Sequence, residues 1–426
     1  MRYKKIPTEL FIKNRSQFAE KMDNNSVAIF NSNDLMPKNA DQNLPFFQNS
    51  DLFYLSGIDQ EESLLMIVKK ESSIGSYLFL RETNDLIKVW EGEKLDKNNA
   101  TSISGIKNVY WDKSFEKVLN TFVSDCSVIY LNSNEHPRAE IIVETRDARF
   151  EKWIKKKFPN KKYKKSTDIL YPLRAIKDDL EIELIKTACD ITADGVKRVL
   201  SFLRPGVMEY EIEAEIAHEF IKSGSRGFAY DPIIASGQNS CVLHYNNNNK
   251  VCASGDIVLM DFGAEYSNYC SDLTRCFPVS GRFSNRQRQV YNSVLRVMKS
   301  AKKMLCPGLG LKEYEINVGK LMEKELVDLQ LISLKDIKNQ EDLPAYKKYY
   351  MHGTSHHLGL DVHDVSGSNQ PLQPGMVLTC EPGIYIPEEG FGIRLENDIV
   401  IGHNENIDLM SKIPIEAEEI EEILNN

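Results

Sequence analysis

The sequence lacks any long uninterrupted apolar run. No window approaches the roughly 18 consecutive apolar residues that a membrane-spanning helix requires. The opening segment, MRYKKIPTELF, contains no apolar core of the kind found in secretory signal peptides. Positive charge is not in excess either, since 53 Lys and Arg stand against 62 Asp and Glu, a formal net charge of −9. These features argue against membrane insertion, secretion and a global attraction to nucleic acid, and we expect a cytoplasmic protein.

Paired cysteine motifs are also missing. The eight cysteines are scattered singly along the chain, with no Cys-x-x-Cys among them. Disulfide frameworks and thiolate zinc sites are usually recognised by closely spaced cysteines. We therefore expect reduced thiols, most of them packed in the interior.

The length and composition indicate more than one globular domain. A chain of 426 residues, 42% hydrophobic and 27% charged, has material for two or three domains of roughly 150 residues. We expect residues 1–173 to form an N-terminal domain of mixed helices and strands, with strands near 63–68, 77–80 and 128–131 and a helix over 139–158. Asp178 and Glu181 have the spacing of a helix-capping box, which predicts the start of a second domain.

The second domain contains an internal repeat. The sequence LRPG at Leu203–Gly206, followed by EYEI at Glu209–Ile212, is echoed by LCPG at Leu305–Gly308 followed by EYEI at Glu313–Ile316. Downstream, GDIVLMDFG at 255–263 is echoed by GMVLTCEPG at 375–383, with a carboxylate six residues after the first glycine in each. Helical spacing at 179–203, 285–305 and 312–329 and alternation at 256–277 and 376–401 predict an α+β domain with antiparallel hairpins. We expect two related halves with a site between them.

Each half offers a pair of carboxylates on a predicted hairpin. A turn centred on 266–267 would place Asp261 opposite Asp272, and a turn at 387–390 would place Glu381 opposite Glu396. Directly opposed residues have Cβ atoms about 5 Å apart, and like charges that close are destabilising unless they are neutralised. Four carboxylates carry a charge of −4, which matches the +4 of two divalent cations. A bulge in either hairpin would change the pairing.

Histidines are concentrated in one short segment. Four of the chain's eight lie in HGTSHHLGLDVHD at 352–364. Imidazole is the commonest metal ligand and a frequent general acid or base. A site rich in carboxylates with one imidazole and no thiolate favours Mn, Mg, Co or Fe over a closed structural zinc site.

A lysine-rich stretch, KWIKKKFPNKKYKK at 152–165, allows two interpretations. It could form a patch that binds nucleic acid, or it could be the solvated end of a helix and the loop that follows. The acidic total favours the second interpretation, so we expect no nucleic-acid partner.

At these residues the sequence resembles the pita-bread metallopeptidases, and among them the Xaa-Pro aminopeptidases (aminopeptidase P). The motifs are VLMDFGAEY, SDLTRCFPVSG, HGTSHHLGLDVHD, LTCEPGIYI and GIRLENDIV, within 173–401, with FFQNSDLFYLSGIDQEESLLMI and VWEGEKL nearer the N-terminus. The chain departs from the family at Phe47, where many members carry arginine. The resemblance implies a pita-bread catalytic domain over 174–426 with a pseudo-twofold repeat, preceded over 1–173 by a smaller α/β creatinase-like domain.

The resemblance also implies a dinuclear metal centre. Its ligands would be Asp261, Asp272, His356, Glu381 and Glu396. The two divalent ions would be Mn²⁺ in the first place, with Co²⁺, Zn²⁺ or Fe²⁺ as alternatives. A water shared by two ions about 3.5 to 4 Å apart can attack a peptide carbonyl.

The same resemblance assigns catalytic roles. Glu381 would move the proton of the attacking water to the leaving nitrogen. His352 and His363 would donate hydrogen bonds to the carbonyl oxygen or the developing oxyanion. His244 matches another active-site histidine of the family. Arg394, two residues before Glu396, would orient carboxylates, although an ordinary surface ion pair is the alternative.

The implied function is removal of the N-terminal residue from peptides with proline in second position. The alternatives are a prolidase, which cuts only Xaa-Pro dipeptides, and a peptide- or histone-binding relative without metal ligands. Family members are commonly dimers or tetramers, so we expect a homodimer or homotetramer. Trp90 and Asp41 are candidates for a contribution to a neighbour's site.

Overall fold

The computed structural model describes residues 3–133, 136, 138–341 and 343–426. The chain divides into two compact units. The N-terminal unit comprises residues 4–174 with 365–367, and the C-terminal unit comprises residues 175–364 and 368–426 together with Tyr3. Within the described ranges, no helix combines the length and apolarity needed to cross a membrane.

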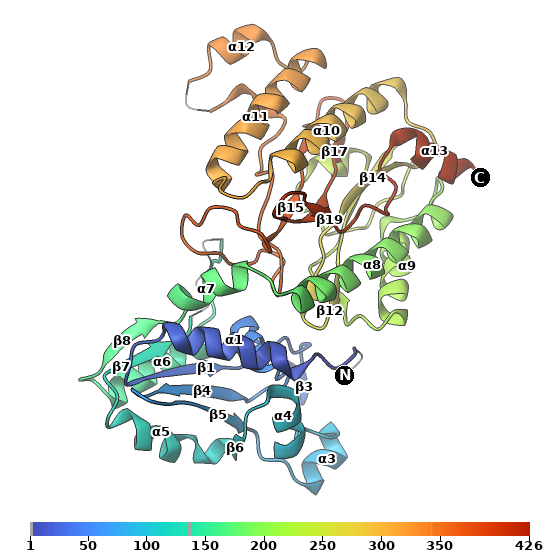
Figure 1. Cartoon of the computed structure of the whole chain (residues 1–426). Helices are drawn as coiled ribbons and strands as arrows, with labels where there is room; N and C mark the ends of the chain where they lie inside the picture. The colour runs from blue at the N-terminus through green and yellow to red at the C-terminus, as the bar shows by residue number, and fades with distance from the viewer. Residues whose placement is uncertain (1–2, 134–135, 137, 342) are drawn as a thin grey trace. The chain divides into compact units, whose positions relative to one another are not determined.

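The N-terminal unit is built on a six-stranded mixed sheet with the order β6-β5-β4-β1-β7-β8 (Figure 1). Its strands are β1 (Ser26–Asn31), β4 (Leu64–Lys69), β5 (Ile74–Leu80), β6 (Asn108–Trp111), β7 (Val128–Leu131) and β8 (Lys162–Lys165), with a separate pair β2 (Pro37–Asn39) and β3 (Gln42–Asn43). Its helices are α1 (Thr8–Lys21), α2 (Ser50–Ser56), α3 (Asp85–Glu91), α4 (Lys97–Ser104), α5 (Phe115–Val123), α6 (Arg146–Lys157) and α7 (Thr167–Ala175). The predicted strands near 63–68, 77–80 and 128–131 are confirmed.

Strand β1 is central, antiparallel to β4 on one side and parallel to β7 on the other. All six of its residues are buried, as expected of a strand covered on both faces. Ile29, Met66, Phe79, Leu119 and Ile154 belong to the core cluster formed between sheet and helices.

The helix expected over 139–158 begins only at Arg146, so the prediction was wrong for residues 139–145. Two local features explain the late start. Thr145 caps the helix by accepting a hydrogen bond from the Ala148 amide at 3.2 Å. The preceding Ile141–Val143 is β-branched throughout and exposed, with Ile142 91% accessible, so no burial compensates for its low helix propensity.

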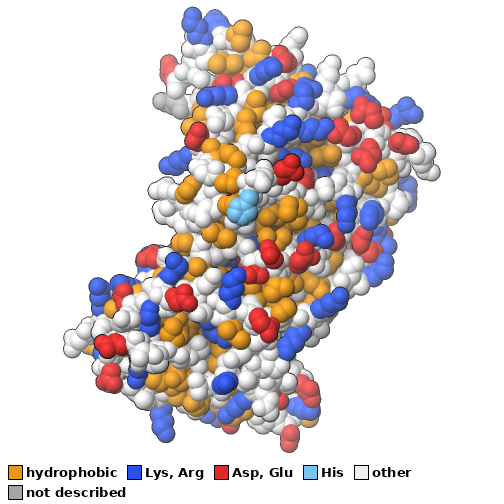
Figure 2. All heavy atoms as spheres, in the orientation of Figure 1, with side chains coloured by type: hydrophobic (Ala, Val, Ile, Leu, Met, Phe, Trp, Pro, Cys, Tyr) orange, Lys and Arg blue, Asp and Glu red, His pale blue; other side chains and the backbone are white. Residues whose placement is uncertain are grey.

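The lysine-rich stretch forms the end of α6 and strand β8. Lys157 pairs with Glu116, and Lys164 pairs with Asp23 at 2.5 Å. On the face drawn in Figure 2, acidic and basic side chains are interspersed. The two ion pairs favour the interpretation of this stretch as solvated secondary structure.

The C-terminal unit repeats a pattern of two helices followed by antiparallel strands. Its helices are α8 (Asp179–Phe202), α9 (Glu209–Lys222), α10 (Asn285–Met304), α11 (Leu311–Asp328), α12 (Leu334–Lys338) and α13 (Ala417–Asn425), with 3₁₀ turns η2 (Gly237–Cys241) and η3 (Ala345–Lys348). The strands of its first half are β9 (Gly227–Phe228), β10 (Ile233–Ser236), β11 (Ile257–Asp261), β12 (Ala264–Tyr266), β13 (Tyr269–Cys270) and β14 (Thr274–Pro278). Those of its second half are β15 (Val377–Cys380), β16 (Gly383–Ile386), β17 (Phe391–Arg394), β18 (Asn397–Val400) and β19 (Ile407–Asp408). The α+β class and the internal repeat are confirmed.

The start of α8 follows the sequence prediction. Asp178 accepts from the Leu180 amide and Glu181 accepts from the Asp178 amide, each at 2.9 Å, which completes the capping box. All eight cysteines are free, and six of them are buried, in agreement with the expected reduced thiols.

The two hairpins differ in how well their pairing was predicted. In the second, Gly383 pairs with Arg394 and Cys380 with Asn397, so the flanking ladders keep the register in which Glu381 faces Glu396. In the first, Asp261 pairs with Thr274, so the predicted opposition of Asp261 and Asp272 was wrong.

The error comes from the position of the turn. Tyr266 pairs with Tyr269, so the turn is Ser267-Asn268, with φ angles of 56° and 67°. Positive φ at both central residues is the type I′ geometry that suits the twist of a hairpin. Moving the turn centre by one residue moves every pair by two.

Gly263 offers a test of this hairpin. A Cβ at this position would lie 1.7 Å from the carbonyl oxygen of Ser271 on the facing segment. We expect Gly263→Ala to lower the free energy of unfolding by about 3 kcal/mol, because the backbones would have to separate. Gly310→Ala is the control, since no atom lies within 4 Å of its added Cβ, and should cost about 1 kcal/mol or less. Equal losses in denaturant titrations would contradict the close approach.

Candidate metal centre

Each of the four predicted acidic residues lies where one strand ends and another begins. Asp261 is the last residue of β11, and Asp272 precedes β14. Glu381 lies between β15 and β16, and Glu396 lies between β17 and β18. Asp272 and Glu396, the second acid of each pair, are the most enclosed, at 5% and 2% accessible. The repeat therefore supplies one carboxylate pair from each half to the interior of the C-terminal unit.

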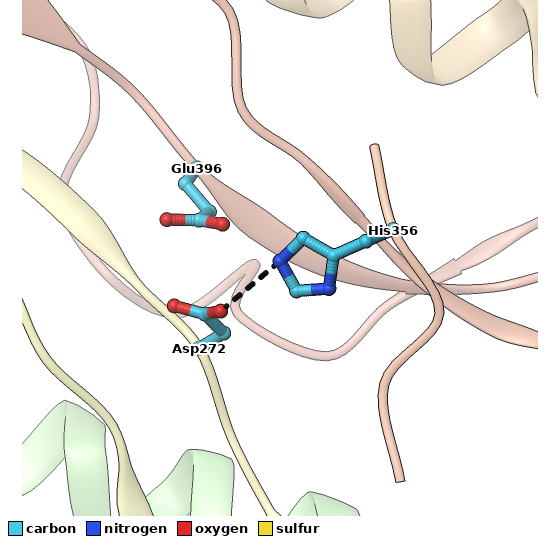
Figure 3. Close-up of side chains that lie close together, drawn as sticks. All are labelled: Asp272, His356 and Glu396. Carbon is cyan, nitrogen blue, oxygen red and sulfur yellow. Dashed lines mark ion pairs between the residues drawn. The ribbon is translucent and has the colours of Figure 1, made fainter. Parts of the chain in front are cut away.

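Asp272, His356 and Glu396 approach closely enough to share one ion. One potential ligand atom from each lies within 4.8 Å of the other two. Figure 3 shows the imidazole directed at the space between the two carboxylates, and Nε2 of His356 is 3.4 Å from Oδ2 of Asp272. Glu381 adjoins this group, with its Oε1 3.6 Å from the same nitrogen.

Backbone pairing alongside β15 explains the place of His356. The Thr379 amide donates to the His356 carbonyl at 3.0 Å, and the Glu381 amide donates to the Thr354 carbonyl at 2.9 Å. His357 forms an isolated bridge with Leu378. Residues 354–357 thus run beside β15. This places His356 near the end of β15 that precedes Glu381.

The fourth carboxylate is held by an arginine. Arg394 donates to Oδ2 of Asp261 at 2.6 Å and to the Tyr385 hydroxyl at 2.8 Å. That hydroxyl also contacts Nε2 of His352 at 2.8 Å. Arg394 is only 4% accessible, so the alternative of an ordinary surface ion pair was wrong.

Two residues that the sequence analysis missed contact three of these carboxylates. The Tyr230 hydroxyl contacts Oδ1 of Asp261 at 2.6 Å and Oδ1 of Asp272 at 2.5 Å. The Thr274 hydroxyl donates to Glu396 at 2.6 Å. Thr274 lies in the SDLTRCFPVSG motif and Tyr230 in none of the motifs, and neither shows its role in the sequence, because each acts through contacts with residues distant in sequence.

A hydroxyl has a single proton, so Tyr230 can donate to only one of its two carboxylates at a time. The second carboxylate then receives no hydrogen bond from Tyr230, so its charge needs another partner.

Burial makes the charged form of these acids unfavourable. It raises the pKa of Glu381 to about 7, against a lowering by His356. Burial, then neighbouring carboxylates, raise the pKa of Glu396 well above its usual range. Burial also raises the pKa of Asp261 despite Arg394. For His356, burial opposes protonation, but Asp272 and Glu381 outweigh it and raise the pKa to about 9. The site therefore holds extra protons unless other positive charge is present.

The remaining predicted histidines lie around this group. Nδ1 of His352 is 3.6 Å from Oε2 of Glu381. Burial and then the charge of Arg394 lower the pKa of His352 to about 3, so it is neutral at pH 7. The ring of His363 packs edge-on against that of His356, with centroids 4.4 Å apart. His244 lies in an exposed loop after η2 and contributes a small further lowering of the His352 pKa.

The donor set suits divalent cations. Hard carboxylate oxygens with one imidazole and no thiolate are typical ligands of Mn²⁺, Mg²⁺ and related ions. Two of the carboxylates share a single hydroxyl, and three have raised pKa values, as expected for acids brought together to hold positive charge. The residues present therefore fit a bound divalent metal.

Comparison with known families agrees with this chemistry. Residues 183–403 match the model of metallopeptidase family M24, and residues 11–130 match that of the aminopeptidase P N-terminal domain. The chain belongs to metallopeptidase family M24 and, within it, to the aminopeptidase P group. It is a hydrolase, a metal-dependent exopeptidase.

Several relatives are similar over their whole length. The Xaa-Pro aminopeptidases of Haemophilus influenzae and Escherichia coli K12 are each 33% identical, and the alignments cover 99% and 98% of this chain and 98% of each relative. A solved structure of zinc-substituted E. coli aminopeptidase P in complex with product superposes with a TM-score of 0.88 at 32% identity, covering 99% of both chains. The predicted pita-bread fold is confirmed.

Metal binding should depend on pH. Without metal, the folded protein binds more protons at its raised carboxyls than the unfolded chain does, so the contribution of these carboxyls to stability should fall as pH rises from about 4.5 to 7. A cation must displace those protons, so its affinity should rise over the same range. We expect the increase in melting temperature caused by Mn²⁺, relative to chelator, to be larger at pH 8 than at pH 5.5.

Calorimetric unfolding of wild type and Glu396→Gln checks this expectation. The variant should lose most of the metal-induced shift. Glu388→Gln, which changes an exposed turn residue between β16 and β17, should keep it. An equal shift at both pH values would contradict the assignment of proton-linked ligands.

Proposed function

We propose that the protein removes the N-terminal residue from peptides that carry proline in second position. Its metal ligands would be Asp261, Asp272, His356, Glu381 and Glu396, holding two divalent ions, Mn²⁺ in the first place. The observation that carries the proposal is the convergence of four carboxylates and His356 from both halves of the repeat on one buried site.

When bound, the metal ions would polarise the scissile carbonyl and lower the pKa of water. Glu381 is the residue we assign as proton shuttle, because a carboxylate beside the attacking water can accept its proton and release it to the leaving nitrogen. His363 would donate a hydrogen bond to the substrate carbonyl. Neutral His352 has a single N–H, and its Nδ1 lies 2.7 Å from the Gly353 carbonyl and its Nε2 2.8 Å from the Tyr385 hydroxyl, so it would donate to the substrate by exchanging one of these contacts. Arg394 would keep Asp261 oriented.

Proline specificity has a simple chemical basis. An Xaa-Pro bond has no N–H, so a site that offers no acceptor there and packs apolar groups around the ring favours proline. The similarity to two full-length Xaa-Pro aminopeptidases supports this substrate class over the dipeptides of a prolidase.

Substrate length and metal dependence test the proposal. With Mn²⁺, wild type should release the first residue from Xaa-Pro-Yaa peptides. His356→Ala should reduce kcat/KM at least about 100-fold. Loss of a residue that only orients a metal ligand commonly costs about 10- to 100-fold, and His356 would bind the metal directly. His403→Ala, which alters an exposed histidine, is the control and should retain activity. Cleavage of Xaa-Pro dipeptides alone would identify a prolidase instead.

We further propose that the protein is a homodimer or homotetramer of the cytoplasm. The N-terminal domain would take part in assembly and in closing the active site. Support comes from α3, a short helix with no buried residue, on which Leu86, Val89 and Trp90 are 66%, 79% and 80% accessible. A surface this apolar is typical of a protein interaction site. Asp41 is a second, exposed candidate for such contacts.

Assembly can be measured directly. We expect wild type to sediment as an oligomer and Val89→Ser/Trp90→Ser to shift toward the monomer, because the change removes two large apolar side chains from the contact. Leu334→Ser, at a residue 74% accessible on α12, is the control and should leave the sedimentation coefficient unchanged. A monomeric wild type would refute this part of the proposal.

A further inference from the structure

In each half of the C-terminal unit, one glutamate on the second helix holds a loop that carries histidines. Glu209 is the first residue of α9, and Glu315 lies four residues after Leu311, the first residue of α11. In the internal repeat Glu209 corresponds to Glu313, so Glu315 lies two positions further along its helix than Glu209 does. Neither belongs to the candidate metal centre.

Glu209 closes the loop between β10 and residue 250. It is completely buried, and its carboxylate accepts four hydrogen bonds. The donors are the Ser236 amide (2.8 Å), Nδ2 of Asn239 (3.0 Å), the Tyr245 hydroxyl (2.8 Å) and the Lys250 amide (2.9 Å). Each of the four donor groups is uncharged. The carboxylate therefore binds both ends of the loop and the residue next to His244.

The same loop is also fastened to the strand that carries Arg394. The Gly392 amide donates to the Ser240 hydroxyl at 2.7 Å. A Cβ on Gly392 would lie 2.6 Å from the Ser240 carbonyl oxygen, so the backbones are in direct contact. Holding this loop therefore fixes His244 relative to β17.

Glu315 holds the other histidine loop in a similar way. Its two carboxylate oxygens accept from the Thr354 amide at 2.8 and 2.9 Å, and one of them also accepts from the Thr354 hydroxyl at 3.1 Å. The Tyr350 hydroxyl contacts that of Thr354 at 2.5 Å. Thr354 lies midway between His352 and His356, so α11 fixes the spacing of these two residues.

A carboxylate is well suited to this task. Each of its oxygens accepts two hydrogen bonds, and bonds to a charged acceptor are stronger than those between neutral groups. Holding a residue in one backbone conformation costs about 1 to 2 kcal/mol of entropy, and a loop residue has no strand pairing to offset this cost. Several charge-assisted bonds converging on one side chain offset part of that cost where the chain has no regular structure.

We infer that Glu209 and Glu315 are positioning residues for the peptidase: Glu209 fixes His244 through Tyr245, and Glu315 fixes His352 and His356 through Thr354. This rests on the proposed function for the role of His244, and on metal binding alone for the role of Glu315. The two roles can therefore be tested separately.

The role of Glu209 is tested through Tyr245→Phe, which removes one hydroxyl and spares the buried carboxylate. We expect kcat/KM on an Xaa-Pro-Yaa peptide to fall about tenfold, because small displacements of an active-site group are costly. Tyr291→Phe is the control, since it also removes a buried hydroxyl, bonded to the Ile415 carbonyl at 2.8 Å, and should cost less than about twofold.

A double-mutant cycle separates positioning from general stability. In a His244→Ala background, Tyr245→Phe should cost less than about twofold, because the group it positions is gone. A tenfold loss in both backgrounds, or a loss equal to that of Tyr291→Phe, would overturn the role of Glu209. Wild type inactive on all Xaa-Pro peptides would instead refute the proposed function.

The role of Glu315 is tested by Mn²⁺ titration calorimetry, which needs no turnover. Glu315→Gln should weaken Mn²⁺ binding about tenfold, as expected when a group that orients a metal ligand is lost. Glu313→Gln, an exposed change on the same helix, is the control and should bind as wild type does. Unchanged affinity in Glu315→Gln, with wild type binding Mn²⁺, would overturn this role while leaving the proposed function intact.

Discussion

The metal centre of the C-terminal unit depends on four closely placed carboxylates that repel one another and on the positive charge that offsets this repulsion. With all four ionised the acids carry −4, while Arg394 supplies +1 and a protonated His356 another +1, which leaves −2. Coulomb energies between close charges rise steeply as water is excluded, so such a surplus is unfavourable. In the metal-free protein, protons relieve it, as the raised pKa values of Glu381 and Glu396 indicate. Bound divalent cations would offset the repulsion while the ligands stay deprotonated.

The duplicated architecture is a means of collecting this charge. One hairpin alone brings two carboxylates together at a strand junction. Two related hairpins, at β11–β14 and β15–β18, bring four to one site and place His356 beside the second. Because each acid lies at the end of a strand, the ladders on either side fix its backbone while its side chain remains free to face the centre.

Much of this arrangement could be predicted from sequence, because it is encoded locally. The capping box at Asp178, the helix end near Leu203 and the pairing that opposes Glu381 to Glu396 all follow from short patterns. The register at Asp261 was mispredicted because it depends on which two residues adopt positive φ, and Ser267-Asn268 is a less distinctive signal than Asn-Gly.

Residues that act across the fold were not predictable in this way. Tyr230, Thr274, Glu209 and Glu315 reach the site through contacts with segments tens of residues away. Glu209 and Glu315 lie in the repeated EYEI segments, but a helical pattern reports only which face is buried and not the partner of a side chain.

The support around the centre has to be rigid because its ligands repel one another. An acid that can rotate away from its neighbours lowers its energy by doing so, and a cation then has to restore the geometry at the expense of its own binding energy. Thr274 removes this freedom by contacting Glu396 and Arg394 together, at 2.6 and 3.0 Å. The Asp272 amide is fixed in turn by Asp398, at 3.0 Å. These contacts order the carboxylates before a cation binds, so less of the cation's binding energy goes into ordering its ligands.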